Sequence, residues 1–245
     1  LADQIQAERL RTEYDRSVLF DTDGREVEGA RAAAMDAIRE RLADAVARAQ
    51  QRDRDVSVQS VADALATQMK ATPAQRRDLA FAVSAEFEQE YAGSASRLST
   101  HWFDDVDEFE GGDVLFAEGF RTIVDHLSAG LRIERNQVVR EVHWRRGAVR
   151  VVTDAGEFEA GQIVVTLPLG VLQAGDVRFV PELPAAKRDA IARVGMGTLD
   201  KCYLKFAEAF WDEDADWLEY IPDTPGVWSE WVSFQRVAGQ PVLLG

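Results

Sequence analysis

The stretch of this chain that says most about its fold is GMGTLDKCYLKF, Gly195 to Phe206. Apolar and polar residues alternate through its second half, which predicts a strand with Lys201 and Lys205 on one face. The chain has only four lysines and uses arginine for nearly all its other cations. A lysine that opens an apolar strand is therefore a candidate functional group. The spacing leaves an ordinary alternative open, a solvated ammonium or an ion pair with Asp200 or Asp176.

Length and composition set the class of protein. At 245 residues the chain can bury a sizeable core in one large or two small domains. A net charge of −15 disfavours nucleic-acid binding and fits cationic partners. Cys202 is the only cysteine, which excludes an intrachain disulfide. No apolar run reaches membrane-spanning length and no leader pattern opens the chain, so a cytoplasmic protein is expected, and the richness in alanine and arginine suggests a bacterial source.

The first ninety or so residues predict a short hairpin followed by helices. Gly24 supplies the turn of a hairpin over residues 16–27. A charged helix follows over residues 28–51, and Ser57 can cap a second helix. Thr72-Pro73-Ala74-Gln75 is a capping box with proline at the first helical position, and the helix that it starts should end near Gly93. Their apolar stripes indicate core packing, the first of them formed by Met35, Ile38, Leu42 and Val46.

From about residue 109 the pattern changes to short strands with glycine-marked turns. Strands are expected at 114–116, 132–134, 138–144, 149–153 and 158–166, with helices at 119–131 and 185–194. The apolar run Ile163-Val164-Val165 predicts a strand buried on both faces. Trp217, Trp228 and Trp231 mark further strands with an aromatic face.

General motifs assign no chemistry. The sequence has no G-x-G-x-x-G dinucleotide fingerprint and no P-loop, because Asp200 stands where the third glycine would follow Gly195 and Gly197. Those two glycines are interpreted as turn residues. The three histidines are scattered and lack metal-ligand spacing, and there is no G-x-S-x-G nucleophile elbow.

Longer segments carry a family resemblance. These are RLSTHWFD (97–104), EGGDVLFAEGF (110–120), LRIERNQVV (131–139), TLPLGVL (166–172) and the G-x-G-x-x-x-K strand that leads to Phe210-Trp211. Their order resembles the flavin-dependent amine oxidases, which include monoamine oxidases, polyamine oxidases and histone lysine demethylases. The similarity runs with gaps from roughly Glu86 to Trp211.

The resemblance implies an α+β fold of the FAD-dependent oxidoreductase type, with a mixed substrate-domain sheet, flanking helices and a partial FAD-binding region. Residues 1–116 would form a substrate-domain part, 117–170 an inserted piece of the FAD-binding domain, and 171–245 the substrate-domain sheet. The family's glycine-rich βαβ unit and its C-terminal segment have no counterpart here, so the chain is expected to be an internal part of a larger enzyme. Alone it should retain little FAD, because the phosphates lack their helix N-terminus.

The chemistry that the resemblance implies is oxidation of an amine C–N bond by FAD, hydrolysis of the imine and release of hydrogen peroxide from dioxygen. Lys201 would hold and orient a water beside the flavin ring. Val139 would meet the adenine through its backbone, although a valine in a strand core is the ordinary alternative. Thr166 and Pro168 lie where open α/β sheets bind ligands, and strand termination explains them equally well.

The substrate expectation rests on the acidic run from Asp104 to Glu110. In some family members the matching loop faces cationic substrate tails, which would give Asp105 and Asp107 a substrate-binding role; a solvated acidic loop is the usual alternative. A small cationic, polyamine-like amine is favoured, with neither nucleic acid nor a membrane segment involved. A related flavoprotein of the amino-acid oxidase or desaturase type stays open, as does a non-catalytic interaction module on the same fold.

Overall fold

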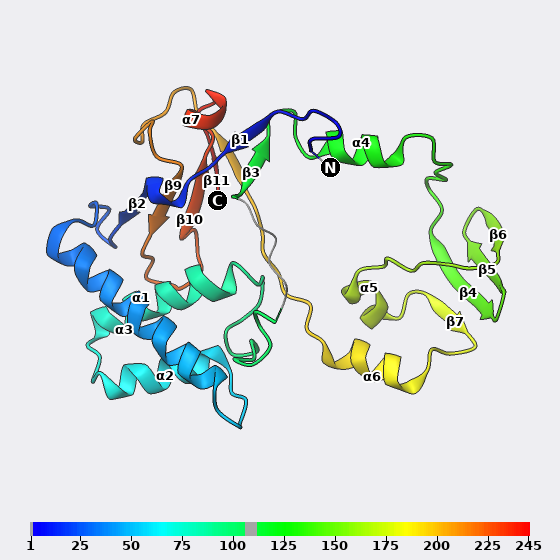
Figure 1. The fold of residues 1–245 in the computed structure, drawn as a ribbon, viewed down its shortest axis with the longest axis horizontal. Coiled ribbons are helices and arrows are strands. Elements are labelled where there is room, and N and C mark those ends of the chain that lie inside the picture. The colour runs from blue at the N-terminus through cyan, green and yellow to red at the C-terminus, as the bar shows by residue number, and fades with distance from the viewer. Residues whose placement is uncertain (1, 106–111) are drawn as a thin grey trace. The chain divides into compact units, whose positions relative to one another are not determined.

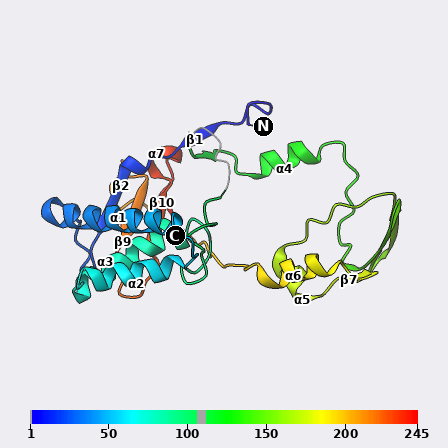
Figure 2. The ribbon, with the colours of Figure 1, turned by 60° about the horizontal axis from the view of Figure 1, so that its bottom comes forward.

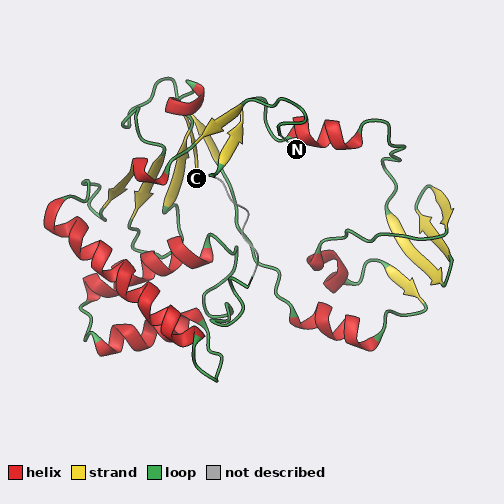
Figure 3. Ribbon diagram, viewed as in Figure 1, coloured by secondary structure: helices red, strands yellow, loops and turns green. Residues whose placement is uncertain are grey.

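The computed structural model describes residues 2–105 and 112–245. The described residues divide into two compact units, Leu1–His126 with Gly197–Gly245, and Leu127–Met196. Those limits differ from the divisions expected near residues 116 and 170. Assignment of the middle part to FAD binding stays a prediction. Each unit contains both helices and strands, in agreement with the expected α+β class (Figure 3).

Three helices form the main core of the first unit, and each begins where the sequence predicts. They are α1 (Gly29–Gln50), α2 (Val58–Gln68) and α3 (Pro73–Val83), and α1 packs across the other two (Figures 1 and 2). The expected stripe of α1 is confirmed, since Met35, Ile38, Leu42 and Val46 are all buried. The Ser57 hydroxyl accepts from the N–H of Ser60, and both bonds of the Thr72–Gln75 capping box are present.

The third helix ends earlier than expected. Regular α-helix stops at Val83 and continues as a wide π-helical turn, Ser84–Glu88. Phe87 stays in the core, whereas Tyr91 is exposed and its ring packs edge-on against Phe103. A π-type turn shifts the direction of the side chains that follow, and such turns are frequent at functional sites. It places Glu86 and Gln89 along a cavity described below.

The main sheet of the first unit has the strand order β2-β9-β10-β11-β8. β2 pairs parallel to β9, and the other neighbours are antiparallel. The expected hairpin is confirmed by the bridge between Phe20 and Glu26 and by the positive φ of Gly24. The strands are β2 (Ser17–Phe20), β8 (Tyr203–Lys205), β9 (Trp217–Tyr220), β10 (Glu230–Ser233) and β11 (Val242–Leu244), with α7 (Gln235–Ala238) between the last two; β1 (Arg9–Arg11) pairs separately with β3 (Val114–Phe116).

The strand that contains the candidate lysine is shorter than its alternation predicts. β8 covers Tyr203–Lys205, and Lys201 lies just before it. Backbone hydrogen bonds in both directions join Cys202 to Gly245, at 2.8 and 3.0 Å. These two bonds fix the residue next to Lys201 against the end of β11.

The second unit has a mixed sheet in the order β6-β5-β4-β7 and two short helices. Gln173 joins those helices by donating to the carbonyls of Ile191 and Val194, both at 2.8 Å. The elements are β4 (Val139–Arg145), β5 (Ala148–Thr153), β6 (Gly156–Ala160), α5 (Leu169–Ala174), β7 (Arg178–Val180) and α6 (Ala185–Arg193); α4 (Arg121–Ser128) crosses the division between the units.

Two strand predictions are wrong in this unit. Residues 132–134 form no strand, and neither do Ile163-Val164-Val165, of which Val164 is 86% exposed. An apolar run becomes a buried strand only where neighbouring strands satisfy its backbone groups, and no strand of the described residues pairs with it.

Candidate functional site

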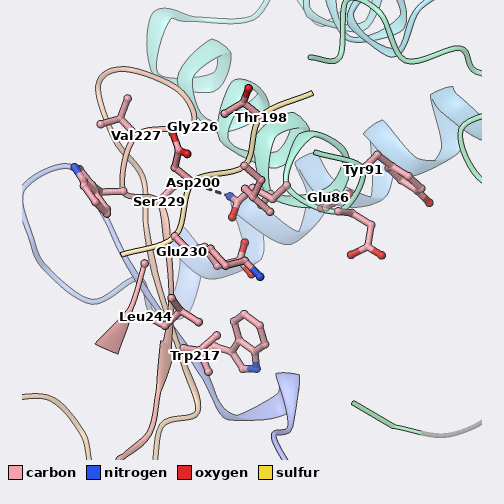
Figure 4. Close-up of a pocket in the computed structure, with 18 of the residues that line it drawn as sticks. Glu86, Tyr91, Thr198, Asp200, Trp217, Gly226, Val227, Ser229, Glu230 and Leu244 are labelled. Carbon is pink, nitrogen blue, oxygen red and sulfur yellow. Dashed lines mark hydrogen bonds between the residues drawn. The ribbon is translucent and has the colours of Figure 1, made fainter. Parts of the chain in front are cut away.

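A cavity of about 980 Å³ lies within the first unit (Figure 4). Its walls come from segments far apart in the sequence: Tyr14, the π turn and the residues after it, the stretch 198–201, Trp217 of β9, the residues 226–230 that lead into β10, and the end of β11. Such a volume is ample for a small ligand. Lys201 is one of the lining residues.

Lys201 is exposed at the surface of this cavity. In the described part of the chain it makes no ion pair within 4 Å, so its ammonium is not neutralised by Asp200. The alternative of a strand-end ion pair with that residue is therefore not what the structure contains. The water-holding role of Lys201 stays a prediction.

A glycine is required at position 197 because another part of the backbone approaches it closely, and not because the chain turns there. Its φ lies outside the left-handed region, which corrects the interpretation as a turn glycine. A Cβ built at Gly197 would overlap the backbone carbonyl of Ala92. This contact holds the stretch before Lys201 against the chain that follows the π turn.

Gly197→Ala is expected to destabilise the protein by about 1–3 kcal/mol, the usual cost of overpacking, and to displace residues 198–201 from the cavity wall. The unfolding temperature and the enzymatic activity should both fall. Gly156→Ala is the matched control, because no atom lies within 4 Å of a Cβ built there. Equal stability of the two variants would contradict the close-approach explanation.

Stacked aromatic rings form part of the wall, which includes Tyr14, Trp217 and Trp228. Tyr14 stacks on Trp217 with 4.6 Å between ring centroids, and Trp228 stacks on Trp231 at 5.3 Å. The Nε1 of Trp217 is buried without a hydrogen-bond partner among the described residues. Aromatic faces attract alkylammonium groups, so this wall suits a cationic ligand.

Carboxylates form the polar part of the same wall. Burial, and after it the nearby Glu219 carboxylate, raises the pKa of Glu230 to about 7. Burial also raises the pKa of Glu86, although Arg39 opposes that effect. Arg39 lies 3.0 Å from Glu219 and 3.5 Å from Glu86. The cavity therefore combines aromatic faces with an excess of negative charge.

Sequence reasoning missed Glu86, Glu230 and Tyr14. The sequence did contain a signal for Glu230, because it is an acidic residue between two tryptophans, Trp228 and Trp231. Nothing in the sequence brings Glu86, 144 positions earlier, to the same place. The tertiary structure brings both carboxylates to the wall of one cavity (Figure 4).

The predicted cofactor-binding residues Val139, Thr166 and Pro168 belong to the second unit, whereas Lys201 belongs to the first. Val139 is the first residue of β4 and pairs with Thr153, while β7 pairs with β4 only from Glu141 onward. Thr166 and Pro168 are exposed; Pro168 directly precedes α5 and Thr166 ends no strand, because the expected buried strand is absent. Their roles toward FAD stay predictions.

The donor set present here fits part of FAD. On the side of β7, the backbone of Val139 has no strand partner among the described residues, so its N–H and C=O groups can meet an adenine edge. The pyrophosphate has no glycine-rich turn in this sequence. The residues present are therefore compatible with the expected adenine contact, and the sequence contains no glycine-rich turn for the phosphates.

The acidic loop is only partly described. Asp105 is exposed, and Asp107 lies outside the described residues. The preceding Asp104 accepts a hydrogen bond from Gln50 at 3.0 Å. Among the described residues no group of metal-ligating side chains gathers, and none of their helices is long and apolar enough to span a membrane.

Known plant proteins are similar to part of this chain in sequence. A lysine-specific histone demethylase 1 homolog 1 from Oryza sativa subsp. japonica is 38% identical over 162 residues, covering 63% of this chain and 19% of that protein. Polyamine oxidase 2 from Arabidopsis thaliana is 32% identical over 155 residues, covering 63% of this chain and 31% of that protein. These relatives are plant proteins and do not support the bacterial source suggested by composition.

Solved structures show the same fold over nearly the whole chain. A putrescine oxidase bound to putrescine superposes with a TM-score of 0.62 at 18% identity, covering 99% of this chain and 60% of that one. The family profile described as flavin containing amine oxidoreductase matches residues 5–245. With that match over almost its entire length, the chain belongs to the flavin-containing amine oxidoreductases, whose cofactor is FAD.

Proposed function

We propose that this chain supplies the substrate cavity and the active-site lysine of an FAD-dependent enzyme that oxidises a primary or secondary amine, with a polyamine-like cation favoured. One observation carries the proposal: Lys201 shares a single cavity with stacked aromatic rings and with the half-buried carboxylates of Glu86 and Glu230. Such walls attract a cationic amine and hold its carbon chain.

The residues of this chain position the substrate and a water. FAD, when bound, supplies the two-electron oxidation of the C–N bond, and dioxygen takes up those electrons as hydrogen peroxide. The stacked rings of Tyr14 and Trp217 give the carbon chain of the substrate an aromatic wall to lie against. Lys201 holds a water that serves as the proton carrier at the reacting end.

The charge of the cavity disfavours one alternative. An amino-acid oxidase needs a cation for the substrate carboxylate, but Arg39 is engaged by Glu219 and Glu86, and Lys201 shares the large cavity with four carboxylates, those of Glu86, Glu90, Asp200 and Glu230. A carboxylate placed here would meet like charges. Peptidyl methyl-lysine is a second candidate substrate, supported by the 38% identity to a histone demethylase homolog and by the same preference for a cationic amine.

The test is a substrate screen on the FAD-loaded enzyme that contains this chain. Diamines, polyamines, monoamines, amino acids and a methyl-lysine peptide are compared by peroxidase-coupled detection of hydrogen peroxide and by anaerobic loss of visible flavin absorbance. Oxidation of cationic amines is expected. Selective oxidation of amino acids, or no flavin reduction by any amine, would overturn the proposal.

The acidic loop gives a prediction of its own. If Asp105 and Asp107 steer a cationic substrate, neutralising both to asparagine should raise KM at low ionic strength. The effect should fade with added salt, because the Debye length falls to about 8 Å near 0.15 M. Steady-state kinetics over a salt series checks it. If the variant and the wild type have the same KM at every ionic strength, the loop is a solvated segment that does not steer the substrate.

A further inference from the structure

One row of residues runs across the sheet of the first unit and ends at the residue next to Lys201. Antiparallel pairing joins β9 to β10, β10 to β11, and the end of β11 to the residue before β8 along this row. Residues that lie directly opposite each other on neighbouring strands project to the same face of the sheet. The row consists of Leu218 in β9, Trp231 in β10, Gly245 directly after β11 and Cys202 directly before β8.

This row lies on the core face of the sheet, whereas Lys201 lies on the cavity face. Trp231 packs against the small buried core that includes residues of β9 and β11. Its neighbours along β10, Glu230 and Val232, line the cavity instead. Successive side chains along an extended chain alternate between the two faces, so the residue before Cys202 faces the cavity, as Lys201 does.

The indole ring of Trp231 occupies the space that a side chain at position 245 would need. A Cβ built on Gly245 would lie 2.6 Å from two carbons of that ring, which is too close for any side chain. The backbone of Gly245 therefore lies directly against the ring. On its other side it exchanges hydrogen bonds of 2.8 and 3.0 Å with Cys202. Because packed interiors transmit displacements, a shift of the ring moves the backbone that holds Lys201.

Trp231 is itself held in one orientation by Trp228. Its Nε1 donates to the backbone carbonyl of Trp228 at 3.0 Å, and the two rings stack with their centroids 5.3 Å apart. Trp228 has a φ of +53°, a left-handed conformation that is unusual for a bulky residue. Strained residues of this kind persist where surrounding contacts fix them, and they gather near active sites. The hydrogen bond and the stacking are such contacts.

We propose that Trp231 is a positioning residue for Lys201, on which it acts through Gly245 and Cys202 from the opposite face of the sheet. The proposal rests on the role of Lys201 in the proposed function and adds a residue that does not line the large cavity. A displacement of about 1 Å at a reacting group can slow an enzyme by roughly 10²-fold. A side chain that contacts no reactant can therefore control turnover.

The experiment measures kcat and KM of the FAD-loaded enzyme that contains this chain, with putrescine, spermidine and a methyl-lysine peptide as substrates. Trp231→Leu removes the ring from Gly245 and should lower kcat by about 10- to 100-fold, while KM stays within about threefold. Trp231→Phe keeps a ring over Gly245 and loses the N–H donor alone. This conservative variant should retain kcat within about fivefold of wild type.

Trp211→Leu is the matched control for a general loss of core packing. Trp211 packs against the same core, and its Nε1 donates to the Ser233 hydroxyl at 2.9 Å, but it lies outside the row that ends beside Lys201. Trp211→Leu should lower the unfolding temperature about as much as Trp231→Leu does. Its kcat should stay within about threefold of wild type, because the backbone at Gly245 keeps its support.

A double variant separates positioning of Lys201 from an independent effect. If Trp231 acts through Lys201, adding Trp231→Leu to Lys201→Met should change kcat by less than about threefold. Gly245→Ala gives a second test that keeps the indole, since its Cβ must displace either the ring or the backbone. It should slow turnover of the wild type and leave turnover of Lys201→Met unchanged, even if Trp231→Leu does not fold.

Equal losses of kcat in Trp211→Leu and Trp231→Leu would make Trp231 an ordinary core residue and overturn the proposal. A loss that is as large in the Lys201→Met background as in the wild type would overturn it as well. If Lys201→Met alone turns over at the wild-type rate, the role of Lys201 fails and this proposal fails with it, while amine oxidation stands. If none of the three substrates reduces the flavin, the proposed function itself fails.

Discussion

Lys201→Met is expected to slow turnover of the FAD-loaded enzyme by roughly 10²- to 10⁴-fold, the usual contribution of general acid–base assistance. Methionine keeps the length and the apolar stem of the side chain but cannot hold or activate a water. Lys201 lies at the surface of the large cavity, immediately before the residue that Gly245 fixes by two backbone hydrogen bonds. Flavin content and fold should be unchanged.

Lys205→Met is the matched control. Lys205 is exposed in β8, pairs with Val242 and does not line the cavity. Anaerobic and aerobic stopped-flow measurements separate flavin reduction from reoxidation, and the Lys201 variant should be slow in one or both. If both steps stay within a few-fold of wild type, the role implied by the family resemblance is wrong at its central residue.

Asp216→Ala is expected to lower the free energy of unfolding by about 3–5 kcal/mol, the cost of removing one partner of a buried ion pair. Its side chain is fully buried and accepts from the guanidinium of Arg236 and from the backbone N–H of Glu13 at 2.8 Å. Loss of the carboxylate leaves these donors unpaired at the start of β9. Because Trp217 follows directly, the cavity wall should loosen as well.

The matched control for Asp216→Ala is Asp214→Ala, an exposed aspartate two positions earlier. A surface change of this kind should alter stability by no more than about 0.5 kcal/mol. Urea unfolding of both variants at neutral pH measures the difference. Equal stabilities would show that the bonds of Asp216 to Arg236 and Glu13 contribute little.

Local features of this protein could be predicted from the sequence because they depend on residues close together in the chain. The stripe of α1, the serine cap of α2 and the Thr72–Gln75 capping box each involve positions within one or two helical turns. The hairpin at Gly24 is equally local. The family, its cofactor and the candidate lysine came from motif order, which needs no knowledge of contacts.

Predictions failed where pairing partners decide the structure. The apolar, β-branched run at Ile163–Val165 has a high strand propensity. A strand forms only where a neighbouring strand pairs with its backbone, and no strand of the described residues pairs with this run. The alternating stretch before Lys205 likewise forms a strand only where β11 pairs with it. Gly197 resembled a turn residue, whereas a distant backbone carbonyl sets its requirement.

The sequence by itself determined the helices, their caps and the family, and it singled out Lys201. Only the tertiary structure decided which other residues share the cavity with it, because Tyr14, Glu86, Trp217 and Glu230 come from four separate segments. The raised pKa of Glu230 has the same origin, since burial and the approach of Glu219 across β9 and β10 create it. Charge and burial at such a site are properties of packing, and packing is not encoded in any one stretch of the chain.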